Sequence, residues 1–127
     1  MRSILRSWLF VPGDNEKMLG KSSGLGADAL VFDLEDAVVE SRKAIARQMV
    51  ADHLQSLDRS ASQLWVRINA LDTPHALEDL AAVMASRPDG VFLPKAEHAN
   101  DAETLAGHIA ELEARHGIEA GSTPIML

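Results

Sequence analysis

The stretch Ala29-Leu-Val-Phe-Asp-Leu-Glu-Asp-Ala-Val38 joins an apolar run to a group of acids. Residues 29–32 are all apolar, which is typical of a strand that is buried on both faces of a parallel sheet. Asp33, Glu35 and Asp36 follow directly. Because α/β proteins carry their chemistry at the carboxyl ends of parallel strands, the pattern indicates a functional site where this strand ends.

The composition is that of a folded domain. The chain has 127 residues, of which 46% are hydrophobic and 24% are charged. The formal net charge of -7 argues against a nucleic-acid binder, which needs clustered Lys and Arg. No run approaches the roughly 18 apolar residues of a membrane span. Cysteine is absent, which excludes disulfides and thiolate metal sites. Without a signal-peptide pattern either, we expect a cytoplasmic protein with no membrane partner.

Four further apolar runs recur along the chain, and amphipathic segments separate them. Each apolar run predicts a strand, and each intervening segment predicts a helix. The predicted strands are 7–11, 29–34, 64–68, 90–93 and 124–127. The predicted helices run from Asp14 or Asn15 to about Ser23, over about 40–57, from Thr73-Pro74 onward and from Asn100 onward.

The helices also show predicted start signals and apolar faces. Thr73 before Pro74 indicates a capping hydroxyl, and Asn100-x-x-Glu103 resembles a capping box. Helical spacing predicts three core-facing stripes: Ile45, Met49, Val50, Leu54 and Leu57; Leu77, Leu80, Ala81 and Met84; and Ala102, Leu105, Ala106, Ile109 and Leu112.

Strict alternation of strands and helices implies a parallel sheet with right-handed crossovers. Either a doubly wound open sheet or part of a (β/α)8 barrel fits this order. No G-x-G-x-x-G follows the first strand, and polar residues follow every complete strand, which favours the barrel because its strand ends ring one mouth. A whole barrel takes about 250 residues. We therefore expect residues 1–127 to form a single α/β domain, the N-terminal part (about five strands) of a TIM (β/α)8 barrel. A short protein with an open sheet, or an assembly of partial barrels, is the alternative.

Arg67 lies near the end of the predicted third strand, with Asn69 just beyond that strand. A guanidinium offers a planar fork for a substrate carboxylate, and a strand end would hold it in place. Arg67 could equally neutralise the acids of the second strand, and the two roles are compatible. Asn69 is a possible supporting residue.

The three acids could position a divalent cation or its waters, or they could form ion pairs. Crowded carboxylates raise one another's pKa values, so a positive group is expected close by. The candidate side chains are Arg42, Lys43 and Arg67.

Lys95 and Glu97 follow the predicted fourth strand. A lysine here could form a Schiff base, but nothing in the local sequence supplies a dry pocket. An ion pair between Lys95 and an acid of the second strand is the favoured interpretation. Lys17 and Lys21, four residues apart on the first helix, could bind phosphates at the mouth. From spacing alone, an ordinary solvated face is the favoured interpretation of that pair.

Four motifs together resemble those of the HpcH/HpaI aldolase and citrate lyase family, and most closely its citrate lyase β-subunit-like members. They lie in order and span nearly the whole chain. The motifs are Arg6-Ser-Trp-Leu-Phe-Val-Pro-Gly-Asp14, Asp28-Ala-Leu-Val-Phe-Asp-Leu-Glu-Asp-Ala-Val38, Val66-Arg-Ile-Asn-Ala-Leu-Asp-Thr-Pro74 and Asp89-Gly-Val-Phe-Leu-Pro-Lys-Ala-Glu97.

The resemblance implies a TIM barrel, usually a homotrimer, that binds Mg²⁺ and acyl-CoA or 2-oxo acid ligands. The implied reaction cleaves or forms a carbon–carbon bond beside a carbonyl, as citryl-, malyl- and citramalyl-CoA lyases do. Malyl-CoA thioesterases are relatives, so a hydrolase is an alternative. A non-catalytic fragment or interaction module is another.

The resemblance also implies roles for individual residues. Arg67 would hold a substrate carboxylate, and Phe10, Lys17 and Lys21 would contact substrate or the CoA phosphates, which reverses the solvated-face interpretation of the lysines. Some members have a tyrosine at the position of Phe10. The acids Asp33, Glu35 and Asp36 would support Arg67 and metal-bound waters and would not ligate the metal. The family's metal ligands, a Glu just past the fifth strand and an Asp after the sixth, are expected beyond Leu127.

Overall fold

The computed structural model describes residues 7–24, 26–56, 62–96 and 100–127. The strands are β1 (Trp8–Pro12), β2 (Ala29–Asp33), β3 (Gln63–Arg67), β4 (Gly90–Phe92) and β5 (Ile125–Met126). The helices are α1 (Glu16–Lys21), α2 (Lys43–Ser56), α3 (His75–Met84) and α4 (Asp101–His116), with short 3₁₀ turns η1 (Ser22–Gly24) and η2 (Glu40–Arg42). Within the part of the chain that the structure describes, no helix has the length and apolar character needed to cross a bilayer.

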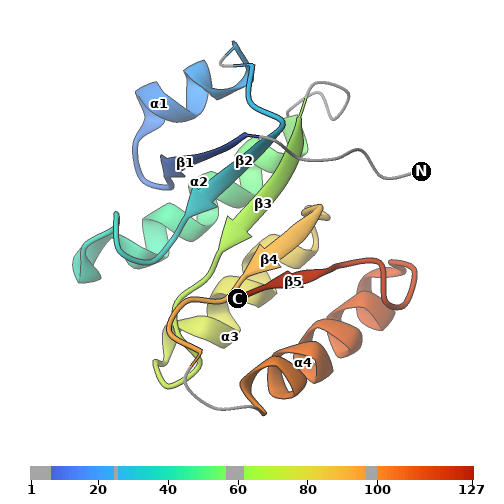
Figure 1. The fold of residues 1–127 in the computed structure, drawn as a ribbon. Helices are drawn as coiled ribbons and strands as arrows, with labels where there is room; N and C mark the ends of the chain where they lie inside the picture. Colours follow the sequence, from blue (N-terminus) through green and yellow to red (C-terminus); the bar gives the residue numbers. More distant parts are fainter. Residues whose placement is uncertain (1–6, 25, 57–61, 97–99) are drawn as a thin grey trace.

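The five strands form one parallel sheet in the order in which they occur in the chain, β1-β2-β3-β4-β5 (Figure 1). A doubly wound sheet reverses direction and leaves its first strand inside the sheet. Here β1 and β5 are the two edges, so every crossover proceeds the same way around. The α/β fold is therefore the singly wound N-terminal part of a TIM barrel, as predicted.

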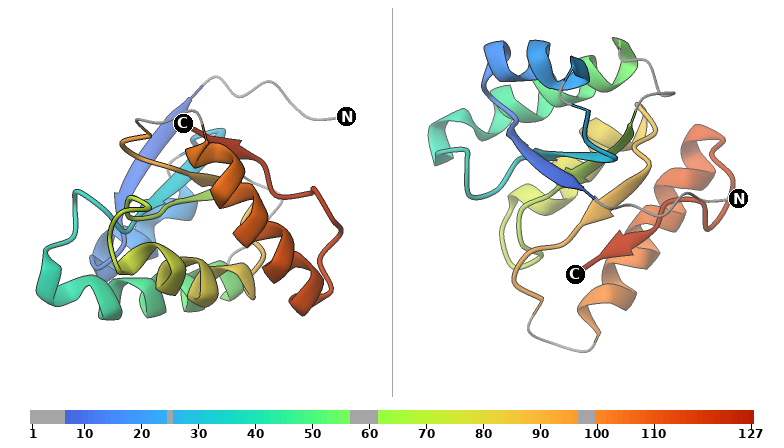
Figure 2. Two further views of the ribbon diagram at one scale, coloured as in Figure 1. Left: turned by 90° about the horizontal axis from the view of Figure 1, so that it is seen from below. Right: turned by 45° about the horizontal axis from the view of Figure 1, so that its top comes forward.

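The main core lies between the sheet and its helices. Along β2, Leu30 and Phe32 point to the helix side and join a cluster with residues of α2, α3 and α4, including Val50, Leu80 and Leu105. Figure 2 shows α2 and α3 together on one side of the sheet. Full burial of a side chain such as Phe32 stabilises the fold by about 1.5–3 kcal/mol.

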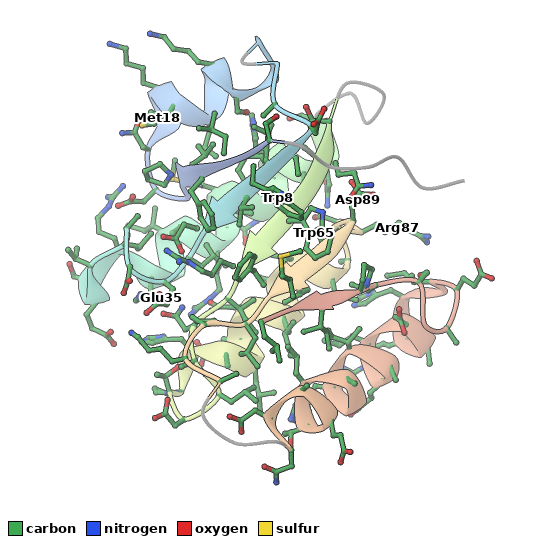
Figure 3. All side chains as sticks on the ribbon, in the orientation of Figure 1. Trp8, Met18, Glu35, Trp65, Arg87 and Asp89 are labelled. Atoms are coloured by element: carbon green, nitrogen blue, oxygen red, sulfur yellow. The ribbon has the colours of Figure 1, made fainter. Side chains whose placement is uncertain are left out.

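The opposite face of the sheet carries a second, aromatic cluster. Trp65 lies there with Trp8, and the two rings meet edge to face at 5.2 Å between centroids (Figure 3). Gly90 is the register partner of Trp65 on β4, and any side chain there would overlap the indole ring. The glycine is therefore required by the size of its neighbour.

The element order matches the prediction, and several boundaries shift. Asn15 caps α1 by accepting a hydrogen bond from the Met18 amide, but the helix ends at Lys21 and a 3₁₀ turn covers the rest. The single helix predicted over 40–57 is a 3₁₀ turn followed by α2. The predicted capping hydrogen bonds are absent at the starts of α3 and α4, where neither Thr73 nor Asn100 bonds a helix amide. The Thr73 hydroxyl donates instead to the Ala70 carbonyl.

The predicted apolar faces are wrong at individual positions. Ile45 and Leu77 are 47% and 54% exposed, because α2 buries Lys43 and Ala46 on its sheet-facing stripe, and α3 buries Asp79. Small or charged residues thus occupy core positions that a purely apolar criterion assigns to larger neighbours. Exposed alanines at 81 and 106 were also assigned to the core, and Leu57 lies outside the described residues.

Gly90→Ala should destabilise the chain by about 1–3 kcal/mol, because its methyl group forces Trp65 out of its packed position. The matched control is Gly107→Ala, since Gly107 is inside α4 and a Cβ there meets nothing within 4 Å. That control should stabilise the chain by about 0.5–1 kcal/mol. Urea denaturation of both variants checks the pair, and a neutral Gly90→Ala would contradict the packing described.

Candidate functional site at the carboxyl ends of the strands

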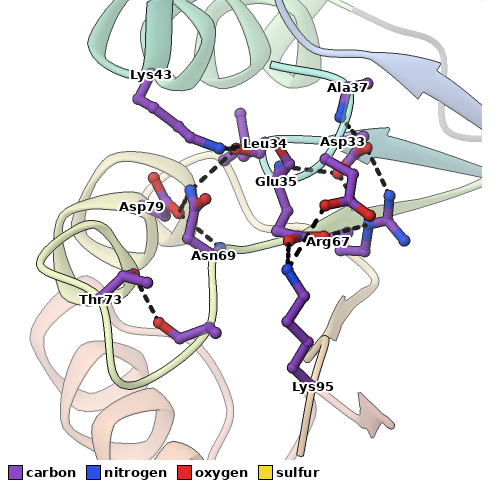
Figure 4. Close-up of polar contacts among 12 residues, drawn as sticks. Asp33, Leu34, Glu35, Ala37, Lys43, Arg67, Asn69, Thr73, Asp79 and Lys95 are labelled. Atoms are coloured by element: carbon purple, nitrogen blue, oxygen red, sulfur yellow. Dashed lines mark hydrogen bonds and ion pairs between the residues drawn. The ribbon is translucent and has the colours of Figure 1, made fainter. Parts of the chain in front are cut away.

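Asp33 and Arg67 form a two-bonded ion pair at the carboxyl ends of β2 and β3 (Figure 4). The two residues are register partners in adjacent parallel strands, so their side chains leave the same face of the sheet. Arg67 Nε donates to Asp33 Oδ1 at 2.9 Å, and Nη2 donates to Oδ2 at 2.7 Å. The backbone amides of Glu35 and Ala37 also donate to the Asp33 carboxylate. The predicted neutralisation of the acids by Arg67 is confirmed.

The pair has a defined electrostatic balance. Burial alone would raise the pKa of Asp33, but the Arg67 hydrogen bond, the two backbone amides and the Arg67 charge outweigh it and lower that pKa. The hydrogen bond and charge of Asp33 raise the pKa of Arg67 against its own desolvation. Both groups are therefore held in their charged forms.

Phe10 of β1 covers one face of the Arg67 guanidinium, whose central carbon lies 4.8 Å from the ring centroid. Phe10 also meets Phe92 of β4 edge to face at 5.8 Å. Phe10 is 41% exposed, so the stack lies at the surface of the site. The structure thus brings together two predicted site residues, Arg67 and Phe10, in a cation–π contact.

Glu35 and Lys95 form a second ion pair beside the first. Lys95 Nζ lies 2.6 Å from Glu35 Oε2 and 3.6 Å from Asp36 Oδ1, while Glu35 Oε1 lies 3.9 Å from Arg67 Nε. The hydrogen bond to Glu35 and the charges of both acids raise the pKa of Lys95. The predicted ion pair with an acid of the second strand is confirmed, and a raised pKa is the opposite of what a Schiff-base lysine requires.

Asn69 forms hydrogen bonds next to the two ion pairs. Two nearby residues, Asp79 and Lys43, have contacts that the sequence did not predict. The Asn69 side-chain amide donates to the Leu34 carbonyl and to the buried carboxylate of Asp79. Lys43, considered as a partner of the acids, instead donates its ammonium to the carbonyls of Leu34 and Glu35. One sequence feature could have pointed to Asp79: it is a charged residue three positions after Ala76, on the apolar face of the predicted helix.

Lys17 and Lys21 are exposed on α1. Among the described residues, no hydrogen bond or ion pair joins either lysine to the Asp33–Arg67 pair. Glu97 lies outside the described residues. The structure therefore brings together six of the predicted site residues, places Asn69 beside them on the Leu34 carbonyl, and does not bring the two lysines to them. Those six are Phe10, Asp33, Glu35, Asp36, Arg67 and Lys95.

The described residues do not by themselves form a Mg²⁺ site. Across residues 7–24, 26–56, 62–96 and 100–127, no three His, Cys, Asp or Glu side chains are grouped to hold a metal. Arg67 and backbone amides already bond both oxygens of Asp33, and Lys95 pairs with Glu35. Acids engaged in this way suit a supporting role, which is the role that the resemblance implied for them.

Asp33→Asn should cost about 1.5–3 kcal/mol at neutral pH, because it removes charged hydrogen bonds to Arg67. The lowered pKa of Asp33 sets the pH dependence: its contribution is complete above the unfolded value, near 3.8, and is lost as the pH falls toward the folded value. The difference in the free energy of unfolding between wild type and Asp33→Asn should therefore become smaller as the pH is lowered. Urea denaturation over a pH series measures it, with the exposed Asp36→Asn as control; a constant difference would contradict the assignment.

Known proteins similar to this chain point to one family. The family model described as HpcH/HpaI aldolase/citrate lyase matches residues 6–127. The citrate lyase subunit beta of Leuconostoc mesenteroides is 40% identical over 97% of this chain and 41% of its own length. The (3S)-malyl-CoA thioesterase of Cereibacter sphaeroides is 38% identical over 84% of this chain and 38% of its own length.

A solved structure of a citrate lyase beta subunit is also similar to this chain. The citrate lyase beta subunit of M. tuberculosis, complexed with oxaloacetate and magnesium, has a TM-score of 0.68 and 32% identity over 93% of this chain and 55% of that one. The chain spans about two fifths of the length of the curated relatives it matches. It belongs to the HpcH/HpaI aldolase/citrate lyase family.

Proposed function

We propose that this chain provides the carboxylate-binding side of the active site of a Mg²⁺-dependent carbon–carbon lyase. The proposed substrate is an acyl-CoA ester of a hydroxy di- or tricarboxylic acid, such as citryl-, malyl- or citramalyl-CoA. Family membership and the citrate lyase relatives support the reaction class.

The observation that carries the proposal is the arrangement of the Arg67 guanidinium. A guanidinium has five N–H donors, and Asp33 takes one from Nε and one from Nη2. Among the described residues, Nη1 has no hydrogen-bond partner. Asp33 binds one edge of the guanidinium plane and Phe10 covers one face. The N–H groups of the remaining edge can therefore donate to a second carboxylate. This geometry makes the two roles of Arg67 compatible, because the structural pair orients the group that binds.

The proposed work of this chain is binding and orientation. Arg67 holds the carboxylate of the oxo-acid portion, and Phe10 forms an apolar wall beside it. Lys17 and Lys21 are proposed to contact the CoA phosphates, since both are exposed on a helix that follows directly from the carboxyl end of β1. The M. tuberculosis relative bound to oxaloacetate supports a 2-oxo acid as the smaller ligand.

Mg²⁺ is proposed as the cofactor because that same relative binds magnesium. Its ligands are proposed to lie in the later strands of the barrel, since the acids described here are already paired with Arg67 and Lys95. We further propose that residues 1–127 belong to a single, incomplete barrel domain, and that the protein is a cytoplasmic homotrimer.

A malyl-CoA thioesterase is the second candidate, favoured by 38% identity to the Cereibacter sphaeroides enzyme. The two reactions on malyl-CoA give different products. A lyase releases acetyl-CoA and glyoxylate, whereas a thioesterase releases malate and free CoA. If the protein releases neither set of products from malyl-CoA, nor the corresponding products from other hydroxyacyl-CoA esters, that result would support the non-catalytic module.

Arg67→Ala should weaken oxaloacetate binding by about 1.5–3 kcal/mol, measured by calorimetry on the full-length protein with Mg²⁺. Arg67→Lys should recover only part of the loss, because an ammonium cannot bond two carboxylates in one plane.

The double variant Lys17→Ala/Lys21→Ala separates the two parts of the site. It should weaken binding of a CoA ester in a salt-dependent way and keep the affinity for oxaloacetate. Wild-type oxaloacetate affinity in Arg67→Ala would remove Arg67 from the site, and an unchanged CoA-ester affinity in the double variant would remove the lysines.

A further inference from the structure

We propose that Asp79 of α3 is a positioning residue that ends β3 just beyond Arg67 and so fixes the Asp33–Arg67 pair. Its effect on ligand binding rests on the function proposed above. Its effect on the pair does not.

The hydrogen-bond pattern between β2 and β3 changes where the two strands end. The Leu34 amide donates to the Arg67 carbonyl at 2.9 Å, as a regular parallel ladder requires. If that ladder continued, the Asn69 amide would donate back to the Leu34 carbonyl. Instead the Asn69 amide donates to Asp79 Oδ2 at 2.9 Å. The backbone of β3 is therefore drawn out of the sheet at this residue.

Side chains replace the lost ladder bond at the Leu34 carbonyl. Asn69 Nδ2 donates to the Leu34 carbonyl at 3.0 Å and to Asp79 Oδ2 at 2.7 Å. Lys43 Nζ of α2 donates to the same Leu34 carbonyl at 3.0 Å. Figure 4 shows Asn69 and Asp79 on one side of Leu34, and Asp33 and Arg67 on the other. Two helices thus set the position of the backbone that carries the pair.

Asp79 is buried in the core together with its charge. Its side chain is fully buried, and its other oxygen, Oδ1, accepts from Arg47 Nε at 3.1 Å. A buried ion pair contributes little net stability compared with apolar packing of the same volume. A carboxylate at this core position is therefore better explained by what it holds in place, the diverted Asn69 amide, than by stabilisation of α3.

The test compares three substitutions by the exchange of the Arg67 Nε–H proton with water, followed by NMR on the full chain. The signal is assigned by its absence in Arg67→Lys. Asp79→Leu removes the acceptor but keeps the branching and the number of side-chain heavy atoms, and it should speed exchange about tenfold. Asp79→Asn keeps one acceptor oxygen for Asn69 and should stay within about twofold of wild type. Val83→Ala, a fully buried change on the same helix, should lower the unfolding midpoint without altering this exchange.

Asn69→Ser serves as the second test if Asp79→Leu does not fold, because it removes both side-chain amide bonds and should also speed exchange about tenfold. Unchanged exchange in the folded variants, or an equal change in Val83→Ala, would overturn the proposal. Oxaloacetate affinity is measured on the same variants. Faster exchange with no oxaloacetate binding in any protein, wild type included, would retain the positioning role and reject the proposed function.

Discussion

The charge of the buried Asp33 carboxylate is the constraint on which the site depends. A carboxylate at the end of a buried strand is costly unless opposite charge and hydrogen bonds compensate it. Arg67 supplies the charge, because the parallel register places it on the same face of the adjacent strand. Two backbone amides beyond β2 supply further hydrogen bonds. The compensation is directional, so it also fixes the plane of the guanidinium.

That fixed plane links the fold to the proposed function. In the sequential sheet the carboxyl ends of β2, β3 and β4 lie side by side, next to β1. Asp33, Arg67 and Lys95, at or just beyond those ends, therefore converge with Phe10 of β1, although the four residues are far apart in the chain. Arg67 pairs with Asp33, and Lys95 pairs with both Glu35 and Asp36. Arg67 keeps N–H donors that Asp33 does not use, and within the described residues no three carboxylates are grouped to hold a metal. A carboxylate-binding role agrees with this balance, and the family relatives act on or bind compounds that carry carboxylates.

The fold could be predicted from the sequence because apolar runs and turn signals alternate clearly, as at residues 29–34 and 90–93. The polar residues after those runs likewise predicted the Lys95 ion pair and the neutralisation by Arg67. The helix faces were harder to predict, since Ile45 and Leu77 are more apolar than Ala46 and Asp79 but lie on the outer side. Asp79 was missed because its proposed role depends on the Asn69 backbone amide, which bonds Asp79 instead of the neighbouring strand. The order of side-chain types in a sequence does not show where a backbone amide leaves a sheet.

A crystal structure of the full-length protein with oxaloacetate and Mg²⁺ tests the central claim most directly. It should show an oxaloacetate carboxylate bonded to the Nη1 edge of Arg67, while both Arg67–Asp33 hydrogen bonds remain. Oxaloacetate bound away from Arg67, or a guanidinium turned from Asp33 to reach it, would contradict the account.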